Sequence, residues 1–359
     1  MSASHIVLPE AAVDLGFFST KLTNGVSSSR NGSLIVTDIF PSFAVRASDH
    51  NSLSRINGAG FGTVDGVTVE VQGASYFVGK SALKATSGMP IERLPNENYS
   101  KTAEYHALFL GALYYMSKHH KVTGSLTIER LCVGLPVATY FSHKAVLEEE
   151  TVGTHVVPCP SDHAKTIKVH IKSCIVISQP QGAALNYSLK YGVSVDKKRI
   201  VVLDLGGGTF DWFFLDKFAP NFQRSGGTQM GVLTGVRAIC NSLDAAYSSS
   251  PLIVDRINDA LVNGAEQLEV DGKQWPMNDL WPMAQSVFVG AIYEMSKSVG
   301  NFREVDHFVF SGGGAELLEK SARSESSVLA GQERKFVVDE DPVFSIVKGF
   351  HAMAQMAGD

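Results

Sequence analysis

The chain contains 359 residues, of which 44% are hydrophobic and 19% are charged, and this balance excludes a disordered or fibrous protein. A single hydrophobic core rarely extends beyond about 250 to 300 residues, so the length predicts two lobes. The formal net charge of −5 excludes a general basic field for nucleic acid, and we therefore expect no direct contact with DNA.

The sequence also lacks features of exported and membrane proteins. Residues Met1 to Glu10 contain no basic region followed by a long apolar core, and the most apolar helical stretch, His106 to Met116, is too short to span a bilayer. The cysteines form no CxxC pair, which favours reduced, buried thiols at Cys132, Cys159, Cys174 and Cys240. We therefore expect a cytoplasmic protein without a membrane span.

A tight hairpin is the first predicted element, with strands at Ala11 to Leu15 and Thr20 to Thr23 around a turn at Gly16 to Ser19. Apolar residues then recur every three or four positions from Tyr105 to Met116, which predicts a helix that packs on a sheet. The other elements expected in this half are strands at 33–40, 68–72, 75–78, 128–135 and 167–177, a loop at 49–62, a turn at 180–182 and a helix at 183–189.

A second strand pair begins the other half of the chain. Ile200 to Leu205 is a nearly continuous apolar run of strand length, and Asp211 to Leu215 follows it after three glycines. We expect helices at 232–243, 254–264 and 281–298, a strand at 306–310, a helix from Ala315 and a last helix at 342–356. This alternation of strands and helices predicts an α/β fold.

Both strand pairs carry an aspartate directly before a glycine turn, in Asp14-Leu15-Gly16 and Asp204-Leu205-Gly206. Glycines let backbone N–H groups approach phosphate oxygens and form an anion-binding concavity. Phosphate would repel an aspartate, so we expect both aspartates to orient the waters around Mg²⁺, while Lys21 offsets phosphate charge. The two hairpins together predict a duplicated phosphate clamp.

The glycine motifs differ in how specific they are. Asp14-Leu15-Gly16 alone would fit an ordinary hairpin, whereas Asp204 to Asp211 (DLGGGTFD) combines three glycines with two carboxylates and a threonine hydroxyl. A third element, Gly312 to Gly314, follows a strand and opens a helix. Alone it would be a common turn, but after two phosphate hairpins it is suited to lie against a nucleotide.

Two other motif-like stretches are better explained without a site. Gly73 to Ser81 resembles a P-loop but has five residues between its glycines where the motif requires four, so we interpret it as a hairpin of a smaller subdomain. The pair His119 and His120, and the pair Cys159 and His163, lack a second pair at zinc-site spacing. We therefore expect no zinc site.

The glycine motifs resemble those of the actin and heat-shock chaperone ATPase superfamily. DLGGGTFD is like its second phosphate motif, Asp14 to Lys21 (DLGFFSTK) resembles its first, and FSGGGAELL at 310–318 resembles its adenosine motif. Within the superfamily the chain looks most like the plasmid-segregation actins of the ParM/StbA family, on the evidence of Leu131 to Phe141, Gly226 to Leu243 and Phe344 to Ala352. The resemblance covers nearly the whole chain in order.

The resemblance implies an α/β actin-like (ribonuclease H-like) fold. Two lobes, each with a mixed sheet flanked by helices, would surround a nucleotide cleft. Residues 1–180 and 342–359 would form the N-terminal lobe, with a smaller subdomain at about 33–100, and residues 181–341 would form the C-terminal lobe.

The same resemblance implies the ligands and the residues of the site. The cofactors would be ATP, with GTP left open, and Mg²⁺ near Asp14 and Asp204. In the family a Glu or Gln after the strand that ends at Ile177 positions the attacking water. Gln179 and Gln181 are the candidates here; Gln181 ranks slightly higher, and Asp204 is the third catalytic candidate. The expected nucleotide-binding residues are Asp14, Gly16, Phe17, Phe18, Ser19, Thr20, Lys21, Gly206, Gly207, Gly208, Thr209, Asp211, Gly312, Gly313 and Gly314.

The implied function is that of an ATPase that forms filaments and segregates plasmid or other extrachromosomal DNA. Its partners would be further copies of itself and a DNA-bound adaptor protein. Two alternatives stay open. A small-molecule kinase of the same fold would need a general-base carboxylate facing an acceptor pocket in the N-terminal lobe. A chaperone-like nucleotide switch would normally carry a substrate-binding domain.

Overall fold

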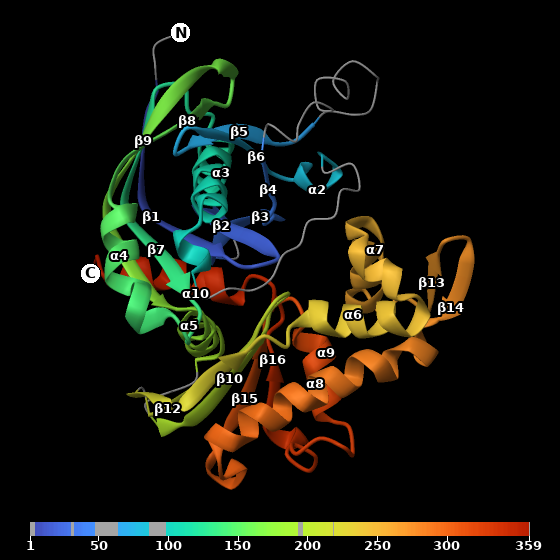
Figure 1. Cartoon of the computed structure of the whole chain (residues 1–359). Helices are drawn as coiled ribbons and strands as arrows, with labels where there is room; N and C mark the ends of the chain where they lie inside the picture. Colours follow the sequence, from blue (N-terminus) through green and yellow to red (C-terminus); the bar gives the residue numbers. More distant parts are fainter. Residues whose placement is uncertain are drawn as a thin grey trace.

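The computed structural model describes residues 4–29, 32–46, 64–85, 98–192, 197–217 and 219–358. Two large sheets lie one above the other, with the helices α5 (Gln179–Tyr191) and α10 (Ser345–Met356) between them (Figure 1). The predicted loop at 49–62 lies outside the described residues. None of the helices in the described ranges is long and apolar enough to cross a membrane.

The upper sheet in Figure 1 has six strands, which in their order across the sheet are β3 (Gly32–Pro41), β2 (Ser19–Ser29), β1 (His5–Leu15), β7 (Ser125–Leu135), β9 (Asp162–Ser178) and β8 (Gly153–Cys159). β1 pairs antiparallel with β2 and parallel with β7, and β7 pairs parallel with β9. Helix α3 (Ala103–His119) is capped by Thr102 and buries Leu108, Ala112 and Met116 in this lobe, as the spacing predicts.

A small sheet lies beside the upper one and contains β4 (Ala44–Arg46), β6 (Ala74–Val78) and β5 (Val67–Val71), followed by the short helix α2 (Ala82–Ala85). β5 and β6 form an antiparallel hairpin whose turn residues Gln72 and Gly73 have positive φ angles of 51° and 78°. The stretch from Gly73 to Ser81 is therefore a hairpin and does not form a P-loop.

The lower sheet in Figure 1 has five strands, in the order β12 (Ala219–Thr228), β11 (Phe210–Asp216), β10 (Arg199–Leu205), β15 (His307–Ser311) and β16 (Phe336–Val338). Its central strand again pairs antiparallel with the next strand in sequence and parallel with a later one. The helices of this lobe are α6 (Val232–Leu243), α7 (Pro251–Val262), α8 (Met277–Val299) and α9 (Ala315–Ala322), and β13 (Gln267–Val270) and β14 (Lys273–Pro276) form a separate hairpin. The repeated topology confirms the predicted actin-like α/β fold.

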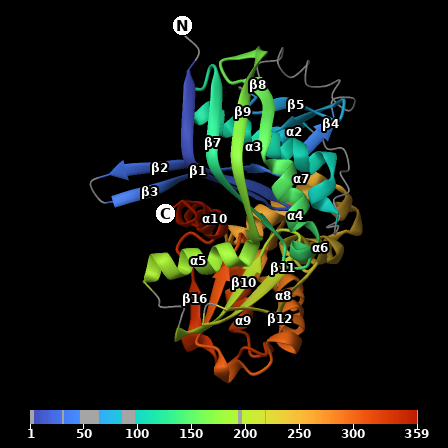
Figure 2. The ribbon, with the colours of Figure 1, turned by 90° about the vertical axis from the view of Figure 1, so that its left-hand side faces the viewer.

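Helices α5 and α10 lie side by side between the two sheets (Figure 2). They contact at Gly182 and Gly349, where an added Cβ on Gly349 would overlap the backbone of Gly182. A shared core joins Ala12 of the upper sheet, Ile200 of the lower sheet and Phe350 of α10. The lobe boundaries expected near residues 180 and 342 stay a prediction.

The predicted turn at 180–182 is wrong, because α5 already begins at Gln179. Pro180 occupies the first turn of the helix, where a missing backbone N–H costs no hydrogen bond. The sequence pattern also gave no signal for α4 (Tyr140–Thr151), whose buried residues are few, or for the short 3₁₀ turn η2 (Tyr99–Lys101).

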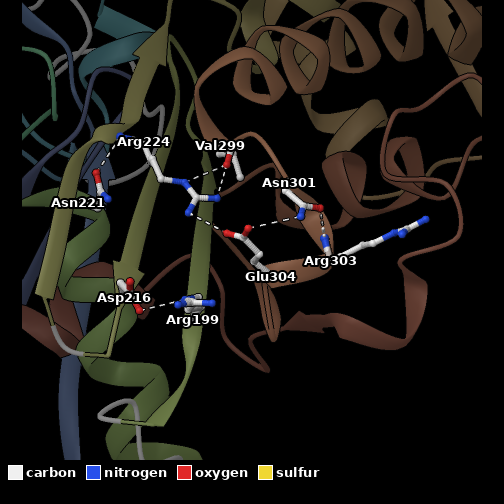
Figure 3. A network of polar contacts seen from close by, with 8 residues as sticks. All are labelled: Arg199, Asp216, Asn221, Arg224, Val299, Asn301, Arg303 and Glu304. Atoms are coloured by element: carbon white, nitrogen blue, oxygen red, sulfur yellow. Dashed lines mark hydrogen bonds and ion pairs between the residues drawn. The ribbon is translucent and has the colours of Figure 1, made fainter.

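A partly buried arginine ties β12 to the C-terminal end of α8 (Figure 3). Arg224 donates from Nε, at 3.0 Å, and from Nη2 to the carbonyl oxygen of Val299, the last residue of α8. Its guanidinium lies 3.7 Å from the ring centroid of Phe214 and also contacts Glu304. A cation at a helix C-terminus satisfies unpaired carbonyls and the helix dipole, so Arg224 fixes α8 against the lower sheet.

Candidate functional site

A cleft of about 230 Å³ opens where β1 and β10 end, and both glycine hairpins line it. The described residues predicted for nucleotide binding that border the cleft are Asp14, Gly16, Phe17, Phe18, Ser19, Lys21, Gly206, Gly207, Gly208, Thr209, Gly312 and Gly313. The catalytic candidates Gln179 and Asp204 border it as well. The structure thus brings together three motifs, and each is about 100 to 190 residues from the next in the sequence.

The first hairpin is electrically balanced. Asp14 is 1% exposed and pairs in register with Lys21 across β1 and β2. Lys21 Nζ lies 3.1 Å from Asp14 Oδ2, and Gln179 Nε2 donates to Asp14 Oδ1 at 2.8 Å. Both carboxylate oxygens therefore have a donor, one charged and one neutral.

The second hairpin carries two buried carboxylates. Asp204 pairs in register with Asp211 across β10 and β11. Asp204 is 7% exposed and Asp211 is 2% exposed. Within the described part of the chain, Asp204 Oδ1 and Asp211 Oδ2 have no hydrogen-bond partner. The hydroxyl of Tyr105, another residue that borders the cleft, also has no partner among the described residues.

Burial explains the electrostatics of this carboxylate pair. It raises the pKa of Asp204 to about 7; the charges of Asp211 and Asp14 add to the shift and that of Lys21 opposes it. Burial also raises the pKa of Asp211 to about 6, although hydrogen bonds from the Thr209 side chain and the Val137 backbone act to lower it. A cation placed near Asp204 would favour its ionised form.

The donor set therefore fits a hydrated magnesium ion. Mg²⁺ prefers carboxylate oxygens and keeps several of its waters, which need acceptors around them. Asp204 Oδ1 is a buried acceptor without a partner, and Asp14 lies across the same cleft. No group of three or more His, Cys, Asp or Glu side chains placed to hold a metal ion occurs in the described ranges, at this cleft or elsewhere.

The tips of the two hairpins meet across the cleft. A Cβ on Gly207 would overlap the Cβ of Phe18 and approach its Cγ to 2.9 Å. Beneath the second hairpin, Val232 N donates to Gly206 O at 2.9 Å and Leu233 N donates to Gly207 O at 2.8 Å. Two backbone hydrogen bonds from the start of α6 thus hold the glycine turn on one side, and Phe18 packs against Gly207 on the side of the first hairpin.

The third glycine element closes against the second hairpin. Gly312 has a φ angle of +85°, and a Cβ there would overlap Asp204 Oδ1. Gly312 N donates to Pro342 O at 3.0 Å, and Gly314 N donates to Leu205 O at 2.9 Å. A side chain at position 313 would meet open space, so Gly313 presents bare backbone to the cleft.

The structure separates the two candidate glutamines. Gln179 is 8% exposed and reaches Asp14, whereas Gln181 Oε1 accepts from Ser178 N at 2.9 Å and from Ser178 Oγ at 2.8 Å. Gln181 therefore completes a capping box at the start of α5 and does not border the cleft. Of the two candidates only Gln179 borders the cleft, and which of them positions a water stays a prediction.

Three further predicted residues support the cleft without lining it. Thr20 is buried and hydrogen bonds Ser42 at 2.9 Å, Asp211 lies behind the glycine turn, and Gly314 packs on Leu205. Sequence reasoning also missed residues that do line the cleft: Tyr99, Ser100, Tyr105, Gly134, Leu135, Pro136, Thr139, Val232, Asn258, Val262, Val343 and Ile346. They lie on several different elements and form no local motif.

Two family models match the chain along most of its length. The model of the actin-like protein N-terminal domain matches residues 12–182, and the model of the C-terminal domain of archaeal MreB-like actin homologues matches residues 202–323. The boundary between the two matches coincides with α5 and the start of β10. A search of curated protein sequences finds no significant match.

Solved structures with this fold include several actin homologues. The crystal structure of the actin-like protein Alp7A superimposes with a TM-score of 0.71 at 15% identity, covering 99% of this chain and 97% of that one. The ADP complex of the archaeal actin homologue Ta0583 gives 0.69 at 20% identity, covering 97% and 99%. A 15-stranded ParM filament from Clostridium botulinum gives 0.68 at 16% identity, covering 97% and 99%. With its two domain matches, its duplicated sheet and its paired glycine hairpins, the chain belongs to the actin-like proteins.

Proposed function

We propose that this actin-like protein binds and hydrolyses ATP with Mg²⁺ in the cleft and uses the cycle to assemble filaments that segregate plasmid or other extrachromosomal DNA. The observation that carries the proposal is the meeting of two glycine hairpins around buried carboxylates, with Asp204 Oδ1 left without a partner in the described structure. Such a site matches a polyphosphate held together with a hydrated cation.

In the proposed complex the glycine turns hold the phosphates. Backbone N–H groups of residues 207–208 and 16–19 would donate to phosphate oxygens, and Lys21 would offset their charge. Asp14 and Asp204 would accept from the waters of the metal ion. Mg²⁺ when bound would neutralise charge that develops on the phosphates. Gly312 and Gly313 would form a flat backbone wall for the nucleoside.

Gln179 is the residue we propose to position the attacking water. Its carboxamide already donates to Asp14 at 2.8 Å, so its orientation is fixed by the first hairpin. A carboxamide can orient a water by hydrogen bonds but cannot remove a proton from it, so positioning is its contribution. We therefore expect slower hydrolysis than a carboxylate at this position would support.

The filament step would follow from lobe closure. A nucleotide that contacts both hairpins bridges the two lobes near the contact of Phe18 with Gly207. Loss of the terminal phosphate would remove part of that bridge and weaken the closed form that assembles. The solved structure of a ParM filament, a structural neighbour of this chain, supports self-assembly. A DNA-bound adaptor protein is the second partner that we propose.

Purified protein should be mixed with ATP and Mg²⁺ while light scattering, pelleting and phosphate release are followed in parallel. We expect assembly that depends on nucleotide, phosphate release without any added acceptor, and loss of phosphate release in Asp204→Ala. Electron microscopy of the pellet would identify filaments.

Absence of polymer over a wide range of protein concentrations would contradict the filament proposal. Phosphate transfer that requires a sugar or carboxylic acid would instead indicate a kinase. Undiminished turnover in Asp204→Ala would contradict the assignment of the site.

A further inference from the structure

A buried phenol on the upper-sheet side of the cleft offers a donor that the protein itself leaves unused. Tyr105 is 3% exposed and borders the cleft, and its hydroxyl has no hydrogen-bond partner within the described residues. Burial is the largest of the effects that raise the pKa of this phenol well above its usual value, so the hydroxyl keeps its proton. A buried hydroxyl costs free energy unless it is hydrogen-bonded, so Tyr105 points to a ligand.

Neighbouring polar side chains on this side of the cleft already have partners in the protein. The hydroxyl of Ser100 shares a hydrogen bond with Nδ1 of His143 at 2.9 Å. The ammonium group of Lys21 lies 3.1 Å from Asp14 Oδ2, so its charge is already offset. A ligand on this side can therefore gain a new hydrogen bond from Tyr105 without breaking one that exists.

The position of Tyr105 at the start of α3 favours an anionic ligand. The backbone N–H of Tyr105 donates to the capping hydroxyl of Thr102 at 3.2 Å, and of α3 the cleft lining includes Tyr105 and none of the later residues. The N-terminal end of a helix carries the positive end of its dipole, which attracts anions. Glu104, the acidic residue of the same turn, is exposed and does not border the cleft.

We propose that the hydroxyl of Tyr105 donates a hydrogen bond to the terminal phosphate of ATP and makes the cleft prefer a nucleoside triphosphate to a diphosphate. This inference rests on the proposed nucleotide site. Closure of the lobes would bring the terminal phosphate, which lies beyond the glycine turns toward Gln179, to the buried hydroxyl. A hydrogen bond to a charged oxygen is stronger than one between neutral groups. Phosphate release would leave the hydroxyl without a partner again, so the contact is made with ATP and lost with ADP.

The preference is tested by isothermal titration of the full chain with ADP and with a non-hydrolysable imido analogue of ATP, both with Mg²⁺. The protein concentration is kept too low for light scattering to rise, so that assembly does not contribute. Tyr105→Phe removes the hydroxyl and keeps the ring, which contacts Tyr99 edge to face with centroids 5.3 Å apart. We expect this variant to bind the analogue roughly tenfold or more weakly than the wild type and to bind ADP almost unchanged, as the strength of a hydrogen bond to a charged group predicts.

Tyr114→Phe is the matched control. Tyr114 is also a buried tyrosine of α3, but its hydroxyl bonds His163 Nε2 at 2.9 Å and it does not border the cleft. This variant should leave the affinity ratio of the analogue and ADP unchanged and should lower the Tm slightly, because it loses a hydrogen bond. Tyr105→Phe should not lower the Tm in the absence of nucleotide, because its hydroxyl has no partner to lose.

The outcomes separate this inference from the proposed function. Equal weakening of the analogue and ADP by Tyr105→Phe, or no weakening of either, overturns the contact with the terminal phosphate while the nucleotide site stands. A wild type that binds neither nucleotide overturns both. A fall in the Tm of Tyr105→Phe beyond that of Tyr114→Phe, or failure to fold, would show that the hydroxyl has a structural role, and this result also overturns the inference.

Discussion

The two phosphate hairpins share a backbone register and differ in charge. In each, an aspartate near the end of the central strand pairs with the residue seven positions later, Asp14 with Lys21 and Asp204 with Asp211. The first pair is an ion pair, and the second consists of two buried carboxylates. The same fold element is thus balanced on one side of the cleft and left acidic on the other.

This difference in charge gives the two hairpins different roles: the first is stable by itself, and the second is suited to bind a ligand. The first hairpin satisfies its own buried charge, so it can keep its shape without a ligand. The second holds two carboxylates whose pKa values are raised by burial to about 7 and about 6. Charge that is buried without a partner costs free energy, and a bound cation would recover part of that cost. We therefore expect the second hairpin to depend on the ligand more strongly than the first.

The largest expected effect is on the free energy of unfolding of Lys21→Met. Removing one partner of a buried ion pair leaves the other charge uncompensated, which costs about 3 to 5 kcal/mol. Asp211→Asn should have the opposite sign in ligand-free protein, since it removes a buried charge while its Oδ1 can still accept hydrogen bonds. Urea unfolding measures both. Equal destabilisation by the two changes would show that the hairpins do not differ in this way.

Asp204→Asn should lower the rate of Mg²⁺-dependent ATP hydrolysis by about 100-fold, the upper range for groups that orient metal-bound waters. The fold should be retained, because the amide is nearly the same size and carries no charge to bury. Phosphate release at saturating Mg²⁺ measures the rate. Recovery of full activity at higher Mg²⁺ would limit the role of Asp204 to metal affinity.

Gln179→Ala should slow hydrolysis roughly tenfold to a hundredfold without weakening nucleotide binding, because a mispositioned water loses reaction geometry. Gln181→Ala is the matched control, since it removes the capping box and should cost about 1 kcal/mol of stability with little change in rate. A rate loss confined to Gln181→Ala would restore the order expected from the sequence.

These two glutamines show where sequence reasoning stops. The hairpins were predictable because their chemistry is local: eight consecutive residues, Asp204 to Asp211, contain the glycines, carboxylates and hydroxyl of the turn. The sequence ranked Gln181 only slightly above Gln179, because their roles depend on whether α5 begins before or after Pro180. A proline two residues past a strand fits both a turn and a first helical turn.

The missed residues have a similar cause. Asn258 is one polar residue on an amphipathic helix, and nothing local distinguishes it from a solvent-facing position. Tyr99 and Tyr105 border the cleft and contact each other edge to face, with ring centroids 5.3 Å apart. The ring of Tyr99 also makes an edge contact with Phe17, with centroids 5.8 Å apart. The fold class could be predicted because strand and helix periods repeat along the chain, whereas the walls of the cleft arise only when distant elements pack.

The contact between the hairpin tips can be broken from either side. Gly207→Val should weaken nucleotide binding roughly tenfold, because its side chain would overlap Phe18 and push the tips apart, an overpacking cost of about 1 to 3 kcal/mol. Phe18→Ala should restore part of the affinity in the double variant, and titration of a fluorescent ATP analogue measures the coupling. Additive effects of the two changes would show that the tips act independently.

The smallest expected effect is a pH dependence that only the second hairpin supplies. Because the pKa of Asp204 is raised to about 7, the carboxyl group is mostly protonated below pH 7 and then cannot accept from metal-bound waters as a carboxylate. Affinity for the Mg²⁺ nucleotide should therefore rise several-fold between about pH 6 and pH 8 and level off above the pKa of Asp204. Asp204→Asn corrects for titration of the nucleotide itself, and its profile should be flatter than that of the wild type. Parallel profiles for the two proteins would mean that Asp204 does not titrate in this range, and the contrast between the hairpins would then rest on geometry alone.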